Sequence, residues 1–92
     1  MTLLHVLSVP DWERLQADAV WVPDPFWHLC TPAQLELVLA RHFAGRTRLV
    51  VLHLDPALLR DVRWEASEPG MEAFPHLYGP LRAHAVMSVM PA

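Results

Sequence analysis

The chain has 92 residues, of which 53% are hydrophobic, and a formal net charge of −3 at pH 7. This length supports one hydrophobic core, and the hydrophobic content excludes a disordered chain, so we expect a single domain over residues 1–92. The chain has seven arginines, no lysine and a negative net charge. Charge alone therefore excludes binding to double-stranded DNA, whereas RNA is not excluded.

The single cysteine, Cys30, excludes an internal disulfide and is typical of a reducing compartment. No run of about 18 apolar residues is present, so the sequence predicts no membrane span. The first residues lack the basic region of a signal peptide. We therefore expect a cytoplasmic protein without membrane partners.

The first third of the chain predicts short strands around one helix. An apolar run over residues 3–7 predicts a buried strand. Ser8 is suited to cap a helix that runs to about residue 17. Two further strands are expected over residues 20–22 and 26–30, separated by a proline-rich turn. The inner face of the helix is expected to hold Trp12, Leu15 and Ala19.

A second helix has the clearest local pattern. Thr31, Pro32 and Gln34 occupy the N-cap, N1 and N3 positions that helix starts prefer. Gly45 suits a left-handed position after the helix end. Apolar spacing predicts one buried stripe formed by Leu35, Val38, Leu39 and His42.

The second half predicts more strands than helices. The nearly continuous apolar run over residues 48–54 predicts a strand covered on both faces. One helical turn over residues 57–59 and strands over residues 61–65 and 81–90 are expected. The irregular stretch over residues 66–75 is long enough to suggest a binding loop. The predicted fold class is α+β, with two helices against several short strands.

Histidine is unusually frequent, and the six rings first suggest a metal. No pair has the close spacing of a usual zinc site, which leaves a site assembled from distant strands or rings that bond to the backbone. For His42 and His53, inside amphipathic or buried elements, we favour the second interpretation. The histidines are His5, His28, His42, His53, His76 and His84.

Nucleophilic and phosphate-binding motifs are weak in this sequence. No GxSxG motif and no glycine-rich loop occur. Cys30 stands two residues after His28, which allows a thiol–imidazole pair, although a small buried core residue is the favoured interpretation. The tryptophans favour core packing over a base-stacking platform. They are Trp12, Trp21, Trp27 and Trp64.

Three groups of residues remain candidates for a site. His5 stands at the centre of the first strand. His28 precedes Thr31 at a helix start, which combines an imidazole, a hydroxyl and a positive dipole suited to an anion or a ribose. The third group flanks the irregular stretch and comprises Glu65, His76 and Tyr78.

The order of these segments resembles the uncharacterised bacterial family called domain of unknown function 952. The resemblance covers nearly the whole chain. It rests on the segments HVLS, PDWE, WHLCT, LDPALL, RWE and FPHLYGPL, in that order.

Members of that family resemble small ADP-ribosyltransferases, in which two short split sheets hold a dinucleotide such as NAD. The resemblance implies that His5 orients a ribose and that His28 and Thr31 lie in the cleft. The expected ligand-binding residues are His5, His28, Thr31 and His76, and the expected catalytic residues are Glu65 and Tyr78. The stretch HLYGPLR lacks the acid that a transferase carries there. The fold is therefore implied more strongly than the activity.

Three functions follow from these expectations. The first is an ADP-ribosyltransferase-like enzyme that uses NAD, or a related nucleotide or phosphorylated ribose, as its substrate and needs no cofactor to fold. The second is a non-catalytic module that binds a nucleotide-like ligand. The third is a protein-interaction domain.

Overall fold

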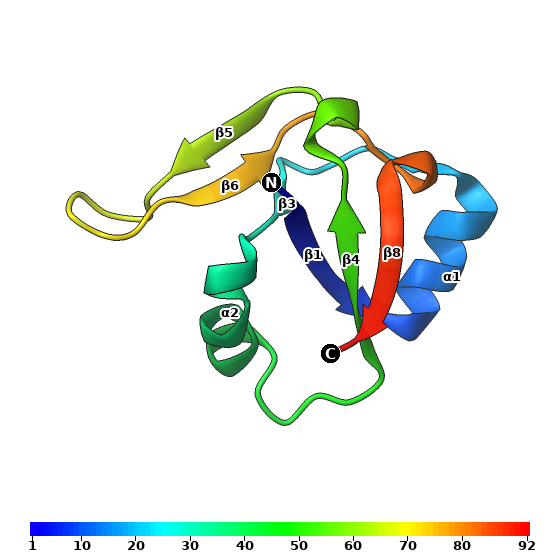
Figure 1. The fold of residues 1–92 in the computed structure, drawn as a ribbon, viewed down its shortest axis with the longest axis horizontal. Helices are drawn as coiled ribbons and strands as arrows, with labels where there is room; N and C mark the ends of the chain where they lie inside the picture. Colours follow the sequence, from blue (N-terminus) through cyan, green and yellow to red (C-terminus); the bar gives the residue numbers. More distant parts are fainter.

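The computed structural model describes residues 1–92 and contains eight short strands and two α-helices (Figure 1). The α+β class predicted from the sequence is confirmed. Neither helix is long and apolar enough to cross a membrane. The α-helices are α1 (Val9–Asp18) and α2 (Leu35–His42), and the 3₁₀ turns are η1 (Pro32–Gln34), η2 (Pro56–Leu58) and η3 (Ala83–Ala85). The strands are β1 (Leu3–Ser8), β2 (Val20–Trp21), β3 (Trp27–His28), β4 (Leu49–Leu54), β5 (Val62–Glu65), β6 (Phe74–Leu77), β7 (Leu81–Arg82) and β8 (Val86–Pro91).

The strands form three antiparallel sheets, whereas the family resemblance implied two. Their orders are β1-β4-β8, β2-β7 and β3-β6-β5. The small β2-β7 sheet exists because the expected strand over residues 81–90 is interrupted by η3. The Ala83 N–H donates to the Ala19 carbonyl at 2.8 Å and so ties the segment to the end of α1 before β8 begins.

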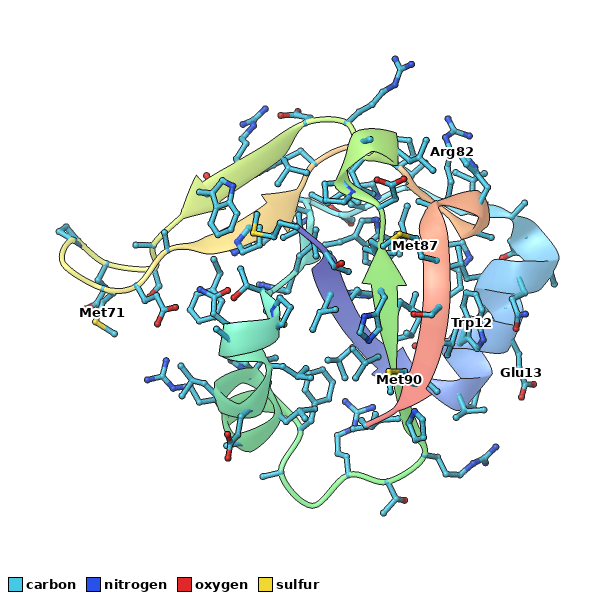
Figure 2. The ribbon with its side chains drawn as sticks, in the orientation of Figure 1. Trp12, Glu13, Met71, Arg82, Met87 and Met90 are labelled. Atoms are coloured by element: carbon cyan, nitrogen blue, oxygen red, sulfur yellow. The ribbon has the colours of Figure 1, made fainter.

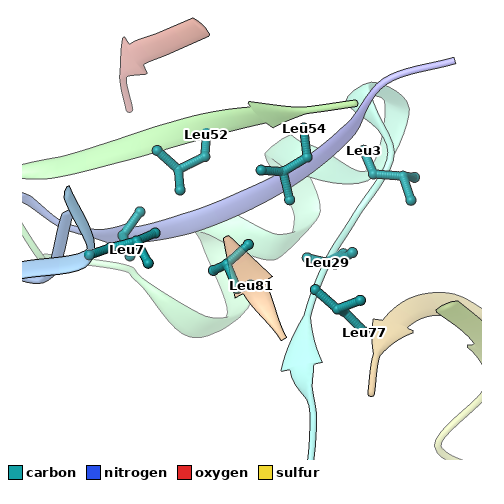
Figure 3. Packing of buried hydrophobic residues seen from close by; sticks show 8 residues of the cluster. Leu3, Leu7, Leu29, Leu52, Leu54, Leu77 and Leu81 are labelled. Atoms are coloured by element: carbon teal, nitrogen blue, oxygen red, sulfur yellow. The ribbon is translucent and has the colours of Figure 1, made fainter. Parts of the chain in front are cut away.

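The core lies on both faces of the central strand β4, as its apolar sequence predicted. Leu52 and Leu54 point to one face, where they join Leu15 of α1 (Figure 3 shows the strand residues). Val51 points to the other face and packs with β1 and the apolar side of α2. Successive strand residues face opposite sides, which explains how one strand serves two clusters.

Helix α1 begins where its cap was predicted. The Ser8 hydroxyl accepts a hydrogen bond from the Asp11 N–H at 3.2 Å. Leu15 is fully buried and Trp12 packs against the same core. The expected inner-face position of Ala19 is wrong, because this exposed residue takes the left-handed C-cap conformation with φ 69° after the helix has ended.

The cap predicted at Thr31 is present and forms a complete capping box with Gln34. The Thr31 hydroxyl accepts from the Gln34 N–H at 3.2 Å, and the Gln34 side chain accepts from the Thr31 N–H at 3.0 Å. These bonds cap η1, which continues into α2. The burial expected of His42 is wrong, because α2 ends at this residue and leaves it exposed. Gly45 has the predicted left-handed conformation, with φ 77°.

Two elements around the candidate site differ from the sequence expectation. The strand expected over residues 26–30 narrows to Trp27–His28, and Cys30 instead forms an isolated bridge with Leu4. The irregular stretch ends earlier than expected, because β6 begins at Phe74. This unpredicted strand β6 is the central strand of its sheet, and it brings the segments that carry the candidate residues together.

Candidate functional site

Three pairs of side chains gather on one face of the β3-β6-β5 sheet. The register pairs His76 with His28 on one side and with Arg63 on the other, so these three side chains share a face. A second side chain lies two residues away from each of them: Phe26 from His28, Glu65 from Arg63 and Tyr78 from His76. The alternation of strand residues places these side chains on the same face. We call this set the polar face: Phe26, His28, Arg63, Glu65, His76 and Tyr78.

A carboxylate is the centre of the polar face. The Tyr78 hydroxyl donates to Glu65 Oε1 at 2.5 Å, and His76 Nδ1 lies 2.9 Å from the same oxygen. The hydrogen bond from Tyr78, followed by that from His76, lowers the pKa of Glu65 below its ordinary value. The same bond to Glu65 raises the pKa of Tyr78. At neutral pH an ionised carboxylate therefore accepts one hydrogen bond from the Tyr78 hydroxyl and one from His76 Nδ1.

This arrangement fixes the orientation of the His76 imidazole. An ionised carboxylate can only accept, so Nδ1 of His76 carries the hydrogen that points to Glu65. In the neutral ring, Nε2 then carries the lone pair and can accept a proton. A carboxylate that orients an imidazole in this way is a common arrangement in general acid–base catalysis.

Aromatic rings frame the imidazole of His76. Phe26 stacks on it, with ring centroids 4.1 Å apart and an interplanar angle of 24°. His28 meets it edge-on at 5.3 Å. Burial, followed by the nearby His76, lowers the pKa of His28. Both effects favour a neutral His28, which can accept or donate a hydrogen bond.

An arginine completes the polar face beside Tyr78. The guanidinium of Arg63 lies over the Tyr78 ring, 4.1 Å from its centroid. Asp61 holds it through two hydrogen bonds of 2.9 and 3.0 Å. These contacts lower the pKa of Asp61, chiefly through the hydrogen bond from Arg63. The guanidinium is thus held in one orientation.

The polar face is open to solvent, whereas the other side of β3 and β6 packs on the core. Leu77 is fully buried in the core, and Trp27 packs against the same cluster. On the polar face, His28 is exposed and the Glu65 side chain is 39% exposed. Reactive groups here are accessible to a ligand without any rearrangement of the core.

The structure places His5 behind this face. Its Nδ1 bonds to the His28 backbone carbonyl at 2.8 Å, and its ring meets Trp27 edge-on at 5.7 Å. Trp27 and His28 alternate across β3, so the rings of His5 and His28 do not share a face. Four of the residues singled out from the sequence therefore meet on the polar face, and His5 supports it through the backbone.

Thr31 and Cys30 have structural contacts instead of contacts with the polar face. The Thr31 hydroxyl is engaged as the helix cap. Cys30 is buried beside Leu4 and Val51, and burial raises the pKa of its thiol to about 11. The thiol is protonated at neutral pH, so the favoured interpretation of Cys30 as a core residue agrees with the structure.

The other histidines and the tryptophans do not belong to the polar face. No three histidine, cysteine, aspartate or glutamate side chains are arranged to hold a metal ion. The backbone bonding favoured for His42 and His53 is wrong, because neither ring makes such a bond in the structure. Trp12, Trp21 and Trp27 pack against the core as favoured, whereas Trp64 is 49% exposed.

Sequence reasoning missed Phe26, Arg63 and Asp61. The first two could have been found by a period-two rule, since each lies two residues before a residue already singled out, His28 and Glu65. Asp61 continues the same alternation one step further along its segment. The missing signal was therefore the strand periodicity around each candidate.

The architecture defines a small α+β domain with an open, histidine-rich sheet face. The chain matches the sequence profile of the family described as Protein of unknown function (DUF952) over residues 6–89, and it belongs to that family. The resemblance expected from the sequence motifs is thereby confirmed.

Solved structures of one protein show the same fold. The crystal structure of CC0527 from Caulobacter crescentus is 28% identical, with a TM-score of 0.87 over 99% of this chain and 85% of that chain. A solution NMR structure of CC0527 is 32% identical, with a TM-score of 0.80 over 96% of this chain and 81% of that chain. No curated protein matches the chain.

Proposed function

We propose that this protein binds a ribose-containing nucleotide, NAD or a 2′-phosphorylated relative, on the polar face and cleaves its ribosyl bond in the manner of an ADP-ribosyltransferase-like enzyme. The observation that carries the proposal is the shared carboxylate: Glu65 accepts from both His76 and Tyr78 at one oxygen.

The polar face supplies the groups that such a cleavage needs. Breaking the bond between ribose C1′ and nicotinamide nitrogen leaves positive charge on the ribose, and nicotinamide departs with the electron pair. The anionic Glu65 would stabilise that charge, because its lowered pKa keeps it ionised. A water oxygen would then add to C1′, and its proton would pass to Nε2 of His76.

The remaining residues would position the substrate. His28 and the Tyr78 hydroxyl oxygen can hydrogen-bond to ribose hydroxyls beside the reacting carbon. The exposed rim of Phe26 offers an aromatic surface to the nicotinamide or adenine ring. We assign His5 a positioning role, because it holds the His28 carbonyl. A direct contact of His5 or Thr31 with a ligand stays a prediction.

A second candidate is binding of the same nucleotide without turnover. It is favoured by the engagement of Glu65, whose Oε1 already accepts two hydrogen bonds within the protein. A carboxylate held in this way interacts less strongly with a developing cation. The two candidates share the binding surface and differ only in whether nicotinamide is released.

The test combines a binding measurement with a turnover measurement. Thermal unfolding of the parent protein is followed with NAD, ADP-ribose and 2′-phosphorylated nucleotides, and nicotinamide release from NAD is followed by chromatography. A ligand at 100 times its Kd adds about 2.7 kcal/mol to native-state stability, which is a shift of roughly 10–20 °C for a domain of this size.

Variants then assign the signal to the polar face. Glu65→Gln is expected to keep binding and lose nicotinamide release, and His28→Ala is expected to lose most of the ligand-induced shift. His53→Ala is the matched control, since it removes a histidine of β4 that does not belong to the polar face. Binding without nicotinamide release by the parent would favour the non-catalytic module. If none of these nucleotides shifts the unfolding temperature of the parent, the proposed function is wrong.

A further inference from the structure

A positively charged recess lies at the other end of β5 and β6 from their connecting loop. Its volume is about 650 Å³, and η2, the segment after β6 and η3 surround it. Arg82 lies at this end of the molecule (Figure 2). None of the lining residues belongs to the polar face. They are Ala57, Leu58, Arg60, Pro80, Arg82 and His84.

The basic side chains of the recess have no acidic partner within the chain. The two side-chain ion pairs of the molecule are Arg63–Asp61 and His76–Glu65. No carboxylate therefore lies within 4.0 Å of the charged groups of Arg60 and Arg82. Two guanidinium groups without a carboxylate partner therefore line the same recess. Both charges would attract an anion that enters the recess.

The backbone segments that carry these side chains are held together by specific contacts. The Tyr78 N–H donates to the Asp61 carbonyl at 2.9 Å. Gly79 packs so closely on the Arg60 carbonyl that a Cβ atom at residue 79 would collide with it. Arg82 is fixed by its β-pairing with Val20. The recess is therefore built by the fold, while its charged ends stay free.

We propose that this recess binds a phosphate group, as a phosphomonoester or a diphosphate. Two guanidinium groups offer paired N–H donors that match phosphate oxygens, and the His84 imidazole adds a third donor. Leu58 and Pro80 provide an apolar wall for the organic part of the ligand. This proposal does not depend on nucleotide binding at the polar face.

The test uses pyrophosphate and inorganic phosphate as probes in isothermal titration calorimetry at low ionic strength. We expect saturable binding of one anion per chain. Arg60→Gln and Arg82→Gln should each raise the Kd about tenfold or more, because each removes a charge-assisted hydrogen bond. Arg41→Gln is the matched control, since it removes the same charge from an exposed position on α2, and its Kd should stay within about twofold of the parent value.

Amide chemical shifts locate the bound anion and confirm that the variants are folded. Shifts confined to residues around Arg60, Arg82 and His84 support the recess. Shifts on the polar face, an equal loss of affinity in Arg41→Gln, or no saturable binding to the parent would overturn the proposal. His76→Ala should leave phosphate binding unchanged, so this outcome is separate from that of the proposed function.

Discussion

The imidazole of His5 donates a 2.8 Å hydrogen bond to the backbone carbonyl of His28 and thereby joins β1 to β3. Two backbone hydrogen bonds between Leu4 and Cys30, of 2.8 and 2.9 Å, continue this contact. A carbonyl can only accept, so Nδ1 of His5 carries a hydrogen. Together these bonds connect the core sheet to the sheet that carries the polar face.

Protonation of His5 is expected to destabilise the folded protein, because the charged ring would be buried. Burial lowers the pKa of His5 below the ordinary value of 6.5. As the pH falls below 6.5, the unfolded chain takes up a proton before the folded chain does, so stability falls. His5→Asn keeps an N–H donor and removes the titration, and it should lose less stability between pH 7.5 and pH 5 than the parent.

Urea unfolding of both proteins at several pH values measures this difference. The remaining titratable groups are shared by both proteins, so they cancel in the comparison. His42→Asn is the control for loss of an exposed histidine. Identical pH dependences for the parent and His5→Asn would show that the His5 pKa is not lowered on folding.

The Tyr78 hydroxyl is expected to set the acidity of Glu65. This hydrogen bond is the main cause of the lowered Glu65 pKa, so Tyr78→Phe should raise that pKa toward its ordinary value of 4.5. Titration of the Glu65 side-chain carboxyl by NMR measures the change. The stabilising effect of the ionised carboxylate is present above pH 4.5 and lost as the pH falls through the lowered pKa. Acid unfolding of Tyr78→Phe should therefore begin at a higher pH.

Other carboxyl groups provide an internal control for this titration. An unchanged Glu65 titration would mean that the bond to Tyr78 does not hold the carboxylate in its charged form.

Gln34 is expected to contribute more stability than the cap residue Thr31. Its side chain caps the Thr31 N–H and also donates to Glu72 and to the Ala73 carbonyl, at 2.5 and 3.0 Å. Thr31→Ala should lower the free energy of unfolding by about 1 kcal/mol. Gln34→Ala should lower it by about 2–3 kcal/mol, because it also releases the loop before β6 and leaves the half-buried Thr31 N–H and Ala73 carbonyl without this partner.

Denaturant unfolding of the two variants measures both values. Gln16→Ala on α1 is the matched control, because Gln16 is exposed and makes no side-chain hydrogen bond in the structure; its stability should stay within about 0.5 kcal/mol of the parent value. A smaller loss for Gln34→Ala than for Thr31→Ala would contradict the role assigned to Gln34.

The Cys30 thiol is expected to be unreactive in the folded protein. Its pKa of about 11 keeps it protonated at pH 8, and its side chain lies within the core. The reaction of a thiol-specific reagent with Cys30 should therefore be limited by the rate of unfolding, and this labelling rate should increase in denaturant. Folding raises the pKa of Cys30 above 9.0, so the protonated thiol stabilises the folded state. This contribution to the free energy of unfolding is complete below pH 9 and is lost as the pH rises toward 11. Fast labelling in native buffer would contradict this prediction.

Local interactions explain which parts of the fold could be predicted from the sequence. The caps at Ser8 and Thr31 depend on a side chain and a backbone N–H three residues away. Gly45 adopts the left-handed conformation that a residue without Cβ favours. Strand β4 could be predicted from its own apolar residues, without knowing which strands it pairs with. Each of these signals lies within a few neighbouring residues.

Strand β6 could not be predicted, because tertiary contacts outweigh its local sequence. Pro75 lies within this central strand, although proline is unfavourable there since it lacks an N–H. The strand tolerates it because β3 is only two residues long and pairs with the other end of β6. At Pro75 the chain supplies an acceptor instead, and its carbonyl receives the Leu29 N–H at 3.0 Å.

The sequence by itself determined which residues were chemically suited to a site, and it singled out His28, Glu65, His76 and Tyr78. The tertiary structure decided that these four share one face and that His5 supports them from behind. The physical reason is register. Strands separated by up to about fifty residues place their side chains together only through long-range antiparallel pairing, and a shift of one residue would turn each of them to the opposite face.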